Sequence, residues 1–422
     1  MDLDRVVDEL GIYQSRDLLA LQWEASQRAI PQEQLSFLSP AFVTEACQGV
    51  YLPREIGAAA VDAARQVAQN PALCALAWHC HWCLYHFEGY PNRVVDRWPS
   101  MKRVLGDTAG LFYALVLLSW FPRMRQVHRA HALPESVVRA SMNQIYRRGE
   151  ACCEMFGRWG LDAHAARWLA NYLRGEIYAL GRLVHQFSIV QDPIRVYRHR
   201  KSSRVIALSE DGIRYRADGQ RCREAETDRV WTSRLEVTGD EVVGNPILPT
   251  GLAVKEQVSL PAAQWTTVLR RGDPVIFFHI PGRSPLDHSL CGASFRAATE
   301  FFPRYFPQWP YKAFYCSSWL LDTQLEQWLP ATANLVRFLQ EFYLFPGGIS
   351  AEPMLLAAFG SVPEDLSCAP RQTRLQRAIC DHVAEGKRLD PAAGRCFLFP
   401  EDLVWGDQVY RNAKFPWDLV GR

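Results

Sequence analysis

The sequence has 422 residues, of which 48% are hydrophobic and 22% are charged. This composition is that of a folded globular protein and excludes the disordered and fibrous classes. A formal net charge of only +2 argues against a protein whose main task is to neutralise nucleic-acid phosphates. The length exceeds the size at which one hydrophobic core usually stops growing, so we expect two domains.

The N-terminal segment lacks the pattern of a targeting signal. It reads MDLDRVVDELGIYQ, which is acidic and amphipathic, whereas a secretory signal has a basic start followed by an apolar run. The longest apolar run, 110–121, is shorter than the roughly 20 residues of a membrane-spanning helix, so we expect a buried core helix. The 12 cysteines are then expected to be reduced thiols. We predict a cytoplasmic location and no membrane span.

Helical patterns dominate the chain from its start to about residue 188. Segments 53–70, 71–90 and 134–157 each begin with proline and end near glycine or asparagine, as helices commonly do. Segment 165–187 carries apolar residues at helical spacing and is predicted to be one continuous helix. Its apolar stripe consists of Leu169, Leu173, Ile177, Leu180 and Val184.

After Pro193 the pattern changes to strands. Short segments between 194 and 238 alternate apolar and polar residues and are separated by turn formers, which indicates antiparallel pairing. A buried strand is then predicted near 273–280. It is followed by a helix over 285–302, a strand over 311–321, a short helix over 322–328 and a strand over 334–345.

Four motifs after residue 172 occur in an order and spacing that is more specific than any one of them alone. They are LRGEIYALGRL (173–183), GDPVIFFHIP (272–281), YCSSWLLDTQLEQWLP (315–330) and NLVRFLQEFYLFP (334–346). Together they resemble the bacterial N-acyltransferase family with a helical N-terminal domain and a GNAT-like C-terminal domain. The resemblance implies an α+β fold. An all-helical domain, residues 1–165, would precede a GNAT-like mixed β-sheet domain with flanking helices, residues 166–422.

The same resemblance implies an acyl-coenzyme A (acyl-CoA) donor. In such a fold a strand, a turn and a helix hold the pyrophosphate, and the next strand is splayed to admit the thioester. Segment 273–289 occupies that place. Two departures are visible. The family pattern before SWLLD is expected to read Cys-His, but here it reads Cys316-Ser317, and the usual GNAT phosphate loop is absent.

The turn after the buried strand suits an anion site. Gly282 permits close backbone approach, Arg283 can contact phosphate, and Ser284 can cap a helix that starts at Pro285. An ordinary strand-to-helix turn with a good cap explains the same local sequence. The candidate CoA-binding residues are Ile280, Pro281, Gly282, Arg283 and Ser284.

His279 is the leading candidate for the catalytic base. It ends the apolar strand, and amide formation from an amine and a thioester requires a group that accepts the ammonium proton. A hydrogen-bonded core histidine is the alternative. Glu176 is the rival base, because a carboxylate on an apolar stripe can have a raised pKa. For Glu176 we favour a salt bridge to Arg174 or Arg182.

The predicted strand YCSSWLL supplies further candidates. Tyr315, Ser317 and Ser318 are candidate catalytic residues that would protonate the departing thiolate or hold the substrate. Strand alternation places Tyr315 and Ser317 on one face and Ser318 on the other, so they cannot all face the substrate. Simple packing of aromatic and small residues is the alternative. The candidate substrate-binding residues are Glu176, Trp319 and Asp322.

A possible zinc motif lies in HCHWCLYH. On a helix His79, Cys83 and His86 share a face, but no paired Cys-x-x-Cys or distant histidine pair completes a tetrahedral set. Neighbouring tryptophans favour core packing. We therefore expect no metal cofactor.

These features predict an acyl-CoA-dependent N-acyltransferase in which the amine attacks the thioester directly in a ternary complex. A free amino acid, a polyamine, a modified peptide and an antibiotic-like amine all fit as the acceptor. The alternative from another class is a non-catalytic GNAT-like binding protein that recognises a peptide or protein partner. A third hypothesis is a hydrolase that uses Cys316 and His279, which would require a lowered thiol pKa.

Overall fold

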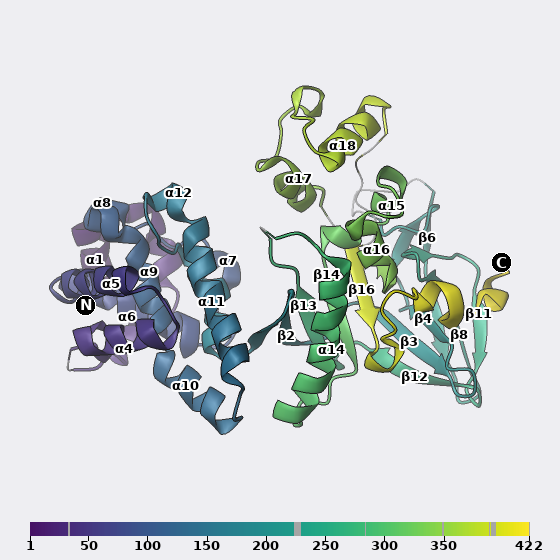
Figure 1. Ribbon diagram of the computed structural model, residues 1–422, viewed down its shortest axis with the longest axis horizontal. Helices are drawn as coiled ribbons and strands as arrows, with labels where there is room; N and C mark the ends of the chain where they lie inside the picture. Colours follow the sequence, from purple (N-terminus) through teal and green to yellow (C-terminus); the bar gives the residue numbers. More distant parts are fainter. Residues whose placement is uncertain are drawn as a thin grey trace. The chain divides into compact units, whose positions relative to one another are not determined.

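The computed structural model describes residues 1–32, 34–222, 229–282, 284–347, 350–387, 389 and 394–421. The chain divides into two compact units, Met1–Leu180 and Gly181–Arg422, which are described separately (Figure 1). The first is helical and the second is built around β-sheets, so the predicted α+β class is confirmed.

The first unit packs its helices around a central apolar one. Its longer helices are α1 (Leu3–Leu10), α4 (Pro40–Gly49), α5 (Arg54–Ala68), α6 (Pro71–Tyr85), α9 (Ala109–Leu118), α10 (Phe121–Ala130), α11 (Glu135–Ala151) and α13 (Ala163–Leu173). Shorter ones are α2 (Arg16–Ala20), α3 (Trp23–Arg28), α7 (Asn92–Val95), α8 (Lys102–Leu105) and α12 (Cys153–Phe156). Every residue of α9 is buried, and α9 contacts α4, α5, α6 and α13. The predicted core helix is confirmed.

The helices of the first unit were compared with the length and hydropathy of a membrane-spanning helix. In the described part of the chain, no helix is by itself long and apolar enough to cross a membrane. The bent pair Lys102–Leu118 and Phe121–Ala130 reaches the required length and hydropathy only when its two helices are counted together.

The predicted continuous helix over 165–187 was wrong. Helix α13 ends at Leu173, and two strands follow, β1 (Ile177–Leu180) and β2 (Leu183–Ile189). Gly175 and Gly181 have φ values of +76° and +72°, which lie in the left-handed region that favours glycine and ends a helix. The apolar spacing that suggested a helical stripe therefore belongs to a helix, a turn and two strands.

The larger sheet of the second unit contains β2, β13 (Pro274–His279), β14 (Ala313–Ser317), β16 (Gly394–Leu398) and β15 (Tyr343–Pro346), in that order. Strands β13 and β14 are parallel, and the other neighbours are antiparallel. Helix α14 (His288–Tyr305) covers one face of this sheet (Figure 1). There Phe295 of α14 packs against His185, Phe278 and Phe314, with ring centroids 5.0–5.9 Å apart.

The remaining helices of this unit are α15 (Leu325–Trp328), α16 (Asn334–Gln340), α17 (Glu352–Phe359) and α18 (Arg374–Ala384). The strand predicted over 334–345 was wrong in its first half, which forms α16, and only its end forms β15. Helix α16 buries Val336, Phe338 and Leu339. Val336 and Leu339 are three positions apart, as on one face of a helix, whereas Val336 and Phe338 are two apart and fit a strand equally well, so the local pattern was ambiguous.

Smaller sheets complete the second unit. One runs in the order β10 (Leu252–Ala253), β9 (Pro246–Leu248), β4 (Val205–Ser209), β3 (Ile194–His199), β12 (Trp265–Arg270). Another runs β11 (Val258–Pro261), β8 (Glu241–Gly244), β7 (Leu235–Val237), and β5 (Arg214–Arg216) pairs with β6 (Val230–Thr232). All these pairings are antiparallel, which confirms the prediction after Pro193.

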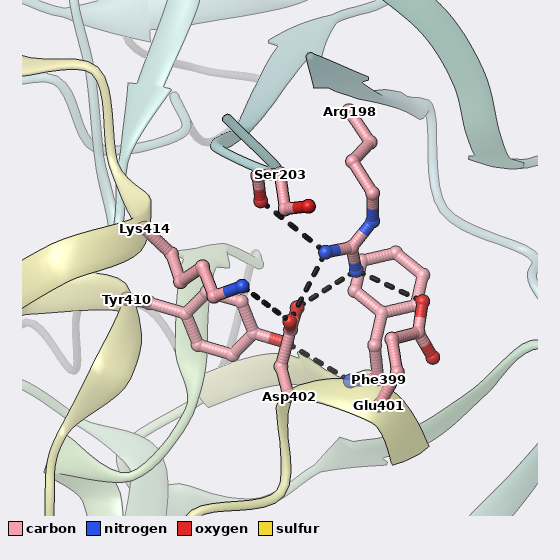
Figure 2. Close-up of polar contacts among 7 residues, drawn as sticks. All are labelled: Arg198, Ser203, Phe399, Glu401, Asp402, Tyr410 and Lys414. Atoms are coloured by element: carbon pink, nitrogen blue, oxygen red, sulfur yellow. Dashed lines mark hydrogen bonds and ion pairs between the residues drawn. The ribbon is translucent and has the colours of Figure 1, made fainter. Parts of the chain in front are cut away.

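A buried carboxylate fixes the segment that follows β16 to strand β3 (Figure 2). The side chain of Asp402 is 1% exposed, and its two oxygens accept hydrogen bonds of 3.0 and 2.7 Å from the Arg198 guanidinium. Lys414 Nζ lies 3.2 Å from the same carboxylate, and the Tyr410 hydroxyl donates to it at 3.2 Å. A buried charge requires such compensation, so the network holds chain segments that are distant in sequence together.

Candidate active site

A fork between two parallel strands lies in the middle of the larger sheet. The pairing of β13 with β14 ends at Phe277 and Tyr315. Beyond that point β13 continues to His279 beside β2, while β14 continues to Ser317 beside β16. The strand edges that face each other past the fork make no pairing in the described part of the chain. Ligands of open α/β sheets bind where the carboxyl ends of parallel strands separate.

His279 lies at the end of one branch of the fork. It is half-buried, and its Nε2 is 2.8 Å from Oε1 of Gln186 on β2. An amide oxygen can only accept, so Nε2 carries the hydrogen in this arrangement. Burial lowers the pKa of His279 to about 4, so the ring is neutral at pH 7. Gln186 was not predicted as a site residue, because the segment that contains it was expected to be helical.

Tyr315 and Ser317 lie on the other branch. Alternation along the paired strands places both on the same sheet face as His279. The Tyr315 hydroxyl donates to the buried carboxylate of Asp192, which also forms an ion pair with Arg395. Burial raises the pKa of Tyr315. Ser317 is exposed at the strand end.

Cys316 and Ser318 lie in environments different from those of Tyr315 and Ser317. Cys316 lies on the sheet face covered by α14 and is 2% exposed, and burial raises the pKa of its thiol. This is opposite to the change that activates a cysteine nucleophile. The Ser318 hydroxyl accepts a hydrogen bond of 3.2 Å from the Leu320 amide and so caps the turn after β14.

The candidate CoA-binding loop connects β13 to α14. Ile280 and Pro281 are half-buried, Gly282 and Ser284 are exposed, and a side chain at position 282 would meet open space. Arg283 lies outside the described residues. The expectation that Ser284 caps a helix starting at Pro285 was wrong. The helix begins at His288, because Asp287 accepts a hydrogen bond of 3.0 Å from the Leu290 amide and caps it.

Two arginines that the sequence analysis missed lie at this loop. Arg182 donates to the carbonyls of Ser284 and Pro285, at 3.0 and 2.9 Å. The exposed Arg337 on α16 has Nη2 3.3 Å from Nδ1 of His288. Both residues are remote from the loop in sequence and belong to no local motif. These two arginines therefore add positive charge beside the loop, whose own sequence contains Arg283.

A buried histidine–glutamate pair supports Arg337. A guanidinium only donates, so His288 Nδ1 accepts from Arg337 and Nε2 can donate to Oε1 of Glu341, which is 2.9 Å away. The other oxygen of Glu341 accepts a 2.9 Å hydrogen bond from the Gly406 amide. His288 and Glu341 are 6% and 4% exposed, so this chain of hydrogen bonds fixes the start of α14.

The predicted substrate-binding residues lie in three different places. Glu176 belongs to the first unit, is 43% exposed in its side chain and pairs with Arg174 at 3.0 Å, which is the salt bridge that we favoured. Trp319 packs against an apolar cluster around Met354 in the second unit. Asp322 is buried, and its Oδ1 accepts a 3.0 Å hydrogen bond from the Gln324 amide.

The residues of HCHWCLYH are engaged within the helical unit. His79 Nδ1 is 2.9 Å from the Ser26 hydroxyl, and its Nε2 is 3.6 Å from the Cys83 sulfur. His86 Nε2 is 3.1 Å from Nε2 of His81 instead. Across the residues that the structure describes, no three His, Cys, Asp or Glu side chains are arranged to hold a metal ion.

The fold and the strand fork define a GNAT-like acyltransferase. Residues 177–396 match the family described as GNAT-like C-terminal domain, and residues 41–175 match the N-acyltransferase N-terminal domain. The chain belongs to this N-acyltransferase family, so the resemblance found in the sequence is confirmed. The two matched regions meet close to the division of the compact units. The domain boundary at 165/166 stays a prediction.

Solved structures with a similar fold are acyltransferases. One, an acyltransferase mutant in complex with octanoyl-CoA, has a TM-score of 0.62 and 19% identity, and covers 94% of this chain and 99% of that one. Another, in complex with decanoyl-CoA and teicoplanin, has a TM-score of 0.61, 20% identity and coverage of 94% and 99%. A third, with CoA and 10C-Teicoplanin, has the same values. None of the curated proteins compared with the sequence matches it.

Proposed function

We propose that the protein transfers an acyl group from acyl-CoA to an amine acceptor. The strand fork carries this proposal, because the edge of β13 past Phe277 is not paired with β14. The pantetheine arm of CoA is an extended chain with two amides, and such a chain can bind an open strand edge through backbone hydrogen bonds. Similar structures that hold octanoyl-CoA and decanoyl-CoA support a medium-chain acyl donor.

The loop after β13 is the proposed site for the CoA phosphates. Its contacts would come from residues Ile280, Pro281, Gly282, Arg283 and Ser284. Asp287 already satisfies the Leu290 amide at the start of α14, so we assign the anion to loop amides and guanidinium groups rather than to the helix end. Arg337, held by His288, is the proposed charged contact from outside the loop.

The proposed reaction needs one proton transfer on each side of the carbonyl. The amine nitrogen attacks the thioester carbon, the C–S bond breaks, one N–H proton leaves, and CoA departs as a thiol. His279 is neutral at pH 7 and takes the proton after attack, when the nitrogen is positively charged. Ser317, exposed at the facing strand end, is the proposed donor to the sulfur. It regains a proton from solvent, to which His279 releases the proton that it took, so both groups return to their starting states. Gln186 orients His279.

The remaining candidates are assigned to supporting roles. Tyr315, bonded to Asp192, would hold the β14 branch in place, and Ser318 would fix the turn after it. Glu176, Trp319 and Asp322 stay proposals for acceptor binding. The structure that holds decanoyl-CoA together with teicoplanin supports an antibiotic-like or peptide amine among the acceptors. Burial of Cys316 favours direct transfer without an acyl-enzyme.

The test is acyl transfer by the purified protein. Octanoyl-CoA and decanoyl-CoA are offered with amino acids, polyamines, peptides and glycopeptide amines, and thiol release and product mass are measured. Arg337→Gln should raise KM for decanoyl-CoA about tenfold, because one charge-assisted contact is lost.

Decanoyl-pantetheine, which lacks the pyrophosphate and the nucleotide, should be used equally well by the Arg337→Gln variant and the parent protein. Arg304→Gln, at the far end of α14, is the matched control and should leave both donors unaffected. No binding and no turnover with any acyl-CoA would refute the proposed function and favour a non-catalytic binding protein.

A further inference from the structure

The helical unit contains a cavity that the proposed transfer reaction does not use. Its volume is about 800 Å³, within the range of cavities that bind small molecules. Residues of the first unit alone line it, from the end of α4, from the whole length of α10 and from the start of α11.

The floor of this cavity is apolar and contains one unsatisfied polar group. Phe121 and Met124 are 3% and 1% exposed, and Val138 adds apolar surface from α11. His128 also lines the cavity and is 8% exposed. Its Nε2 is buried and has no hydrogen-bond partner within the described ranges. A buried polar atom without a partner costs about 1–3 kcal/mol of stability. A ligand group that hydrogen-bonds to His128 Nε2 would therefore stabilise the protein.

At the cavity, the ends of α4 and α10 are closed by residues with left-handed backbone conformation. Tyr51 and Ala132 have φ values of +60° and +48°, and both line the cavity. Their amides donate to the carbonyls of Gln48 and Arg129, each at 3.0 Å, and close α4 and α10. The left-handed conformation costs a non-glycine residue about 1–2 kcal/mol. Two strained residues thus shape one cavity, a pattern that occurs at ligand sites.

The charges at the rim favour an anion. Glu45 pairs with Arg125, and Glu135 pairs with Arg139 at 3.0 Å. Both carboxylates at the rim are therefore neutralised. Arg129, which also lines the cavity and is exposed, forms no ion pair with any residue whose placement is described.

We propose that this cavity binds a small amphipathic carboxylate. Its apolar body would lie on Phe121 and Met124, and its carboxylate would pair with Arg129. Nε2 of His128 would form a hydrogen bond to the same carboxylate. Burial lowers the pKa of His128 to about 4, so the ring is neutral at pH 7 and compatible with an apolar floor. This inference does not depend on the proposed transfer reaction.

Decanoate, kept below its micellar concentration, is the probe, and binding to the full chain is measured by calorimetry at pH 7. Saturable binding is expected. Arg129→Gln should weaken it at least tenfold, and Val138→Trp, which places an indole in the cavity, should abolish it. Arg147→Gln, an exposed arginine of α11 outside the cavity, is the matched control and should bind as the parent protein does.

Two comparisons separate this site from others. Decanol lacks the carboxylate, so its weaker binding should be the same for the parent protein and Arg129→Gln. Saturating decanoyl-CoA should leave decanoate binding intact, because the donor site is a different one. The proposal is overturned if decanoate does not bind, if Arg129→Gln binds it equally well, or if decanoyl-CoA displaces it.

Discussion

His185 provides a direct test of how the sheet core is built. It lies on β2, is fully buried and is surrounded by Phe295, Phe302 and Phe314, with ring centroids 5.9–6.2 Å away. Neither ring nitrogen has a hydrogen-bond partner within the described residues. Burial lowers the pKa of His185 to about 3, from an ordinary value of about 6.5.

The sign of the pH effect follows from this depressed pKa. Between about pH 6.5 and pH 3 the unfolded chain binds a proton at His185 and the folded chain does not. The free energy of unfolding therefore decreases as the pH falls, by about 1.4 kcal/mol per pH unit from this residue. Above pH 6.5 His185 is neutral in both the folded and the unfolded chain, so its titration no longer lowers the free energy of unfolding.

We predict that His185→Leu stabilises the protein, and more so in acid. At pH 7 the gain should be about 1–3 kcal/mol, since two unsatisfied buried nitrogens are removed. At pH 5 about 2 kcal/mol should be added, because the unfolded variant no longer binds the proton. Urea denaturation at both pH values measures this. If the two units unfold in separate transitions, only one should shift.

Phe187→Leu is the control, because it alters the same face of the same strand without removing a titratable group. It should change stability equally at pH 7 and pH 5. An equal effect of His185→Leu at both pH values would refute the reasoning, since it would mean that the folded protein accommodates a protonated imidazole at this position.

Two further variants test the network of Figure 2 and the proposed base. Asp402→Ala should lower the free energy of unfolding by about 3–5 kcal/mol, because Arg198 and Lys414 lose their buried counter-charge. Denaturant titration measures this, and a loss below about 1 kcal/mol would show that water replaces the carboxylate. His279→Ala should lower kcat at pH 7 by about 10². A decrease under tenfold with unchanged melting temperature would remove His279 from the role of base.

Local patterns predicted the helices that have clear ends. Proline at the start and asparagine or glycine near the end located α5 and α6, since these residues act through backbone geometry alone. The helix predicted over 134–157 begins where expected but is two helices, α11 and α12, and Gly157 ends the second. Strand β2 was missed for the opposite reason. Its residues form a strand because β13, about 90 positions later, pairs with it, and no short-range signal carries that information.

The candidate site was predictable to a similar extent. The positions of His279 at a strand end and of the loop after it could be predicted because strand, turn and helix are consecutive in the sequence; their roles stay predictions. Gln186, Arg182 and Arg337 were missed, because each reaches the site from a separate element. Their positions follow from the pairing of strands and the packing of α16 on α14, which depend on the whole fold.

The order of strands in the larger sheet also has a consequence for synthesis of the chain. Strand β16 lies between β14 and β15, yet it is the last of the sheet strands to leave the ribosome. Until it emerges, β14 and β15 each lack a neighbour, and such open edges can pair with other chains. The nascent second unit therefore exposes unpaired strand edges until residues 394–398 have been made, because a position inside its sheet is filled last.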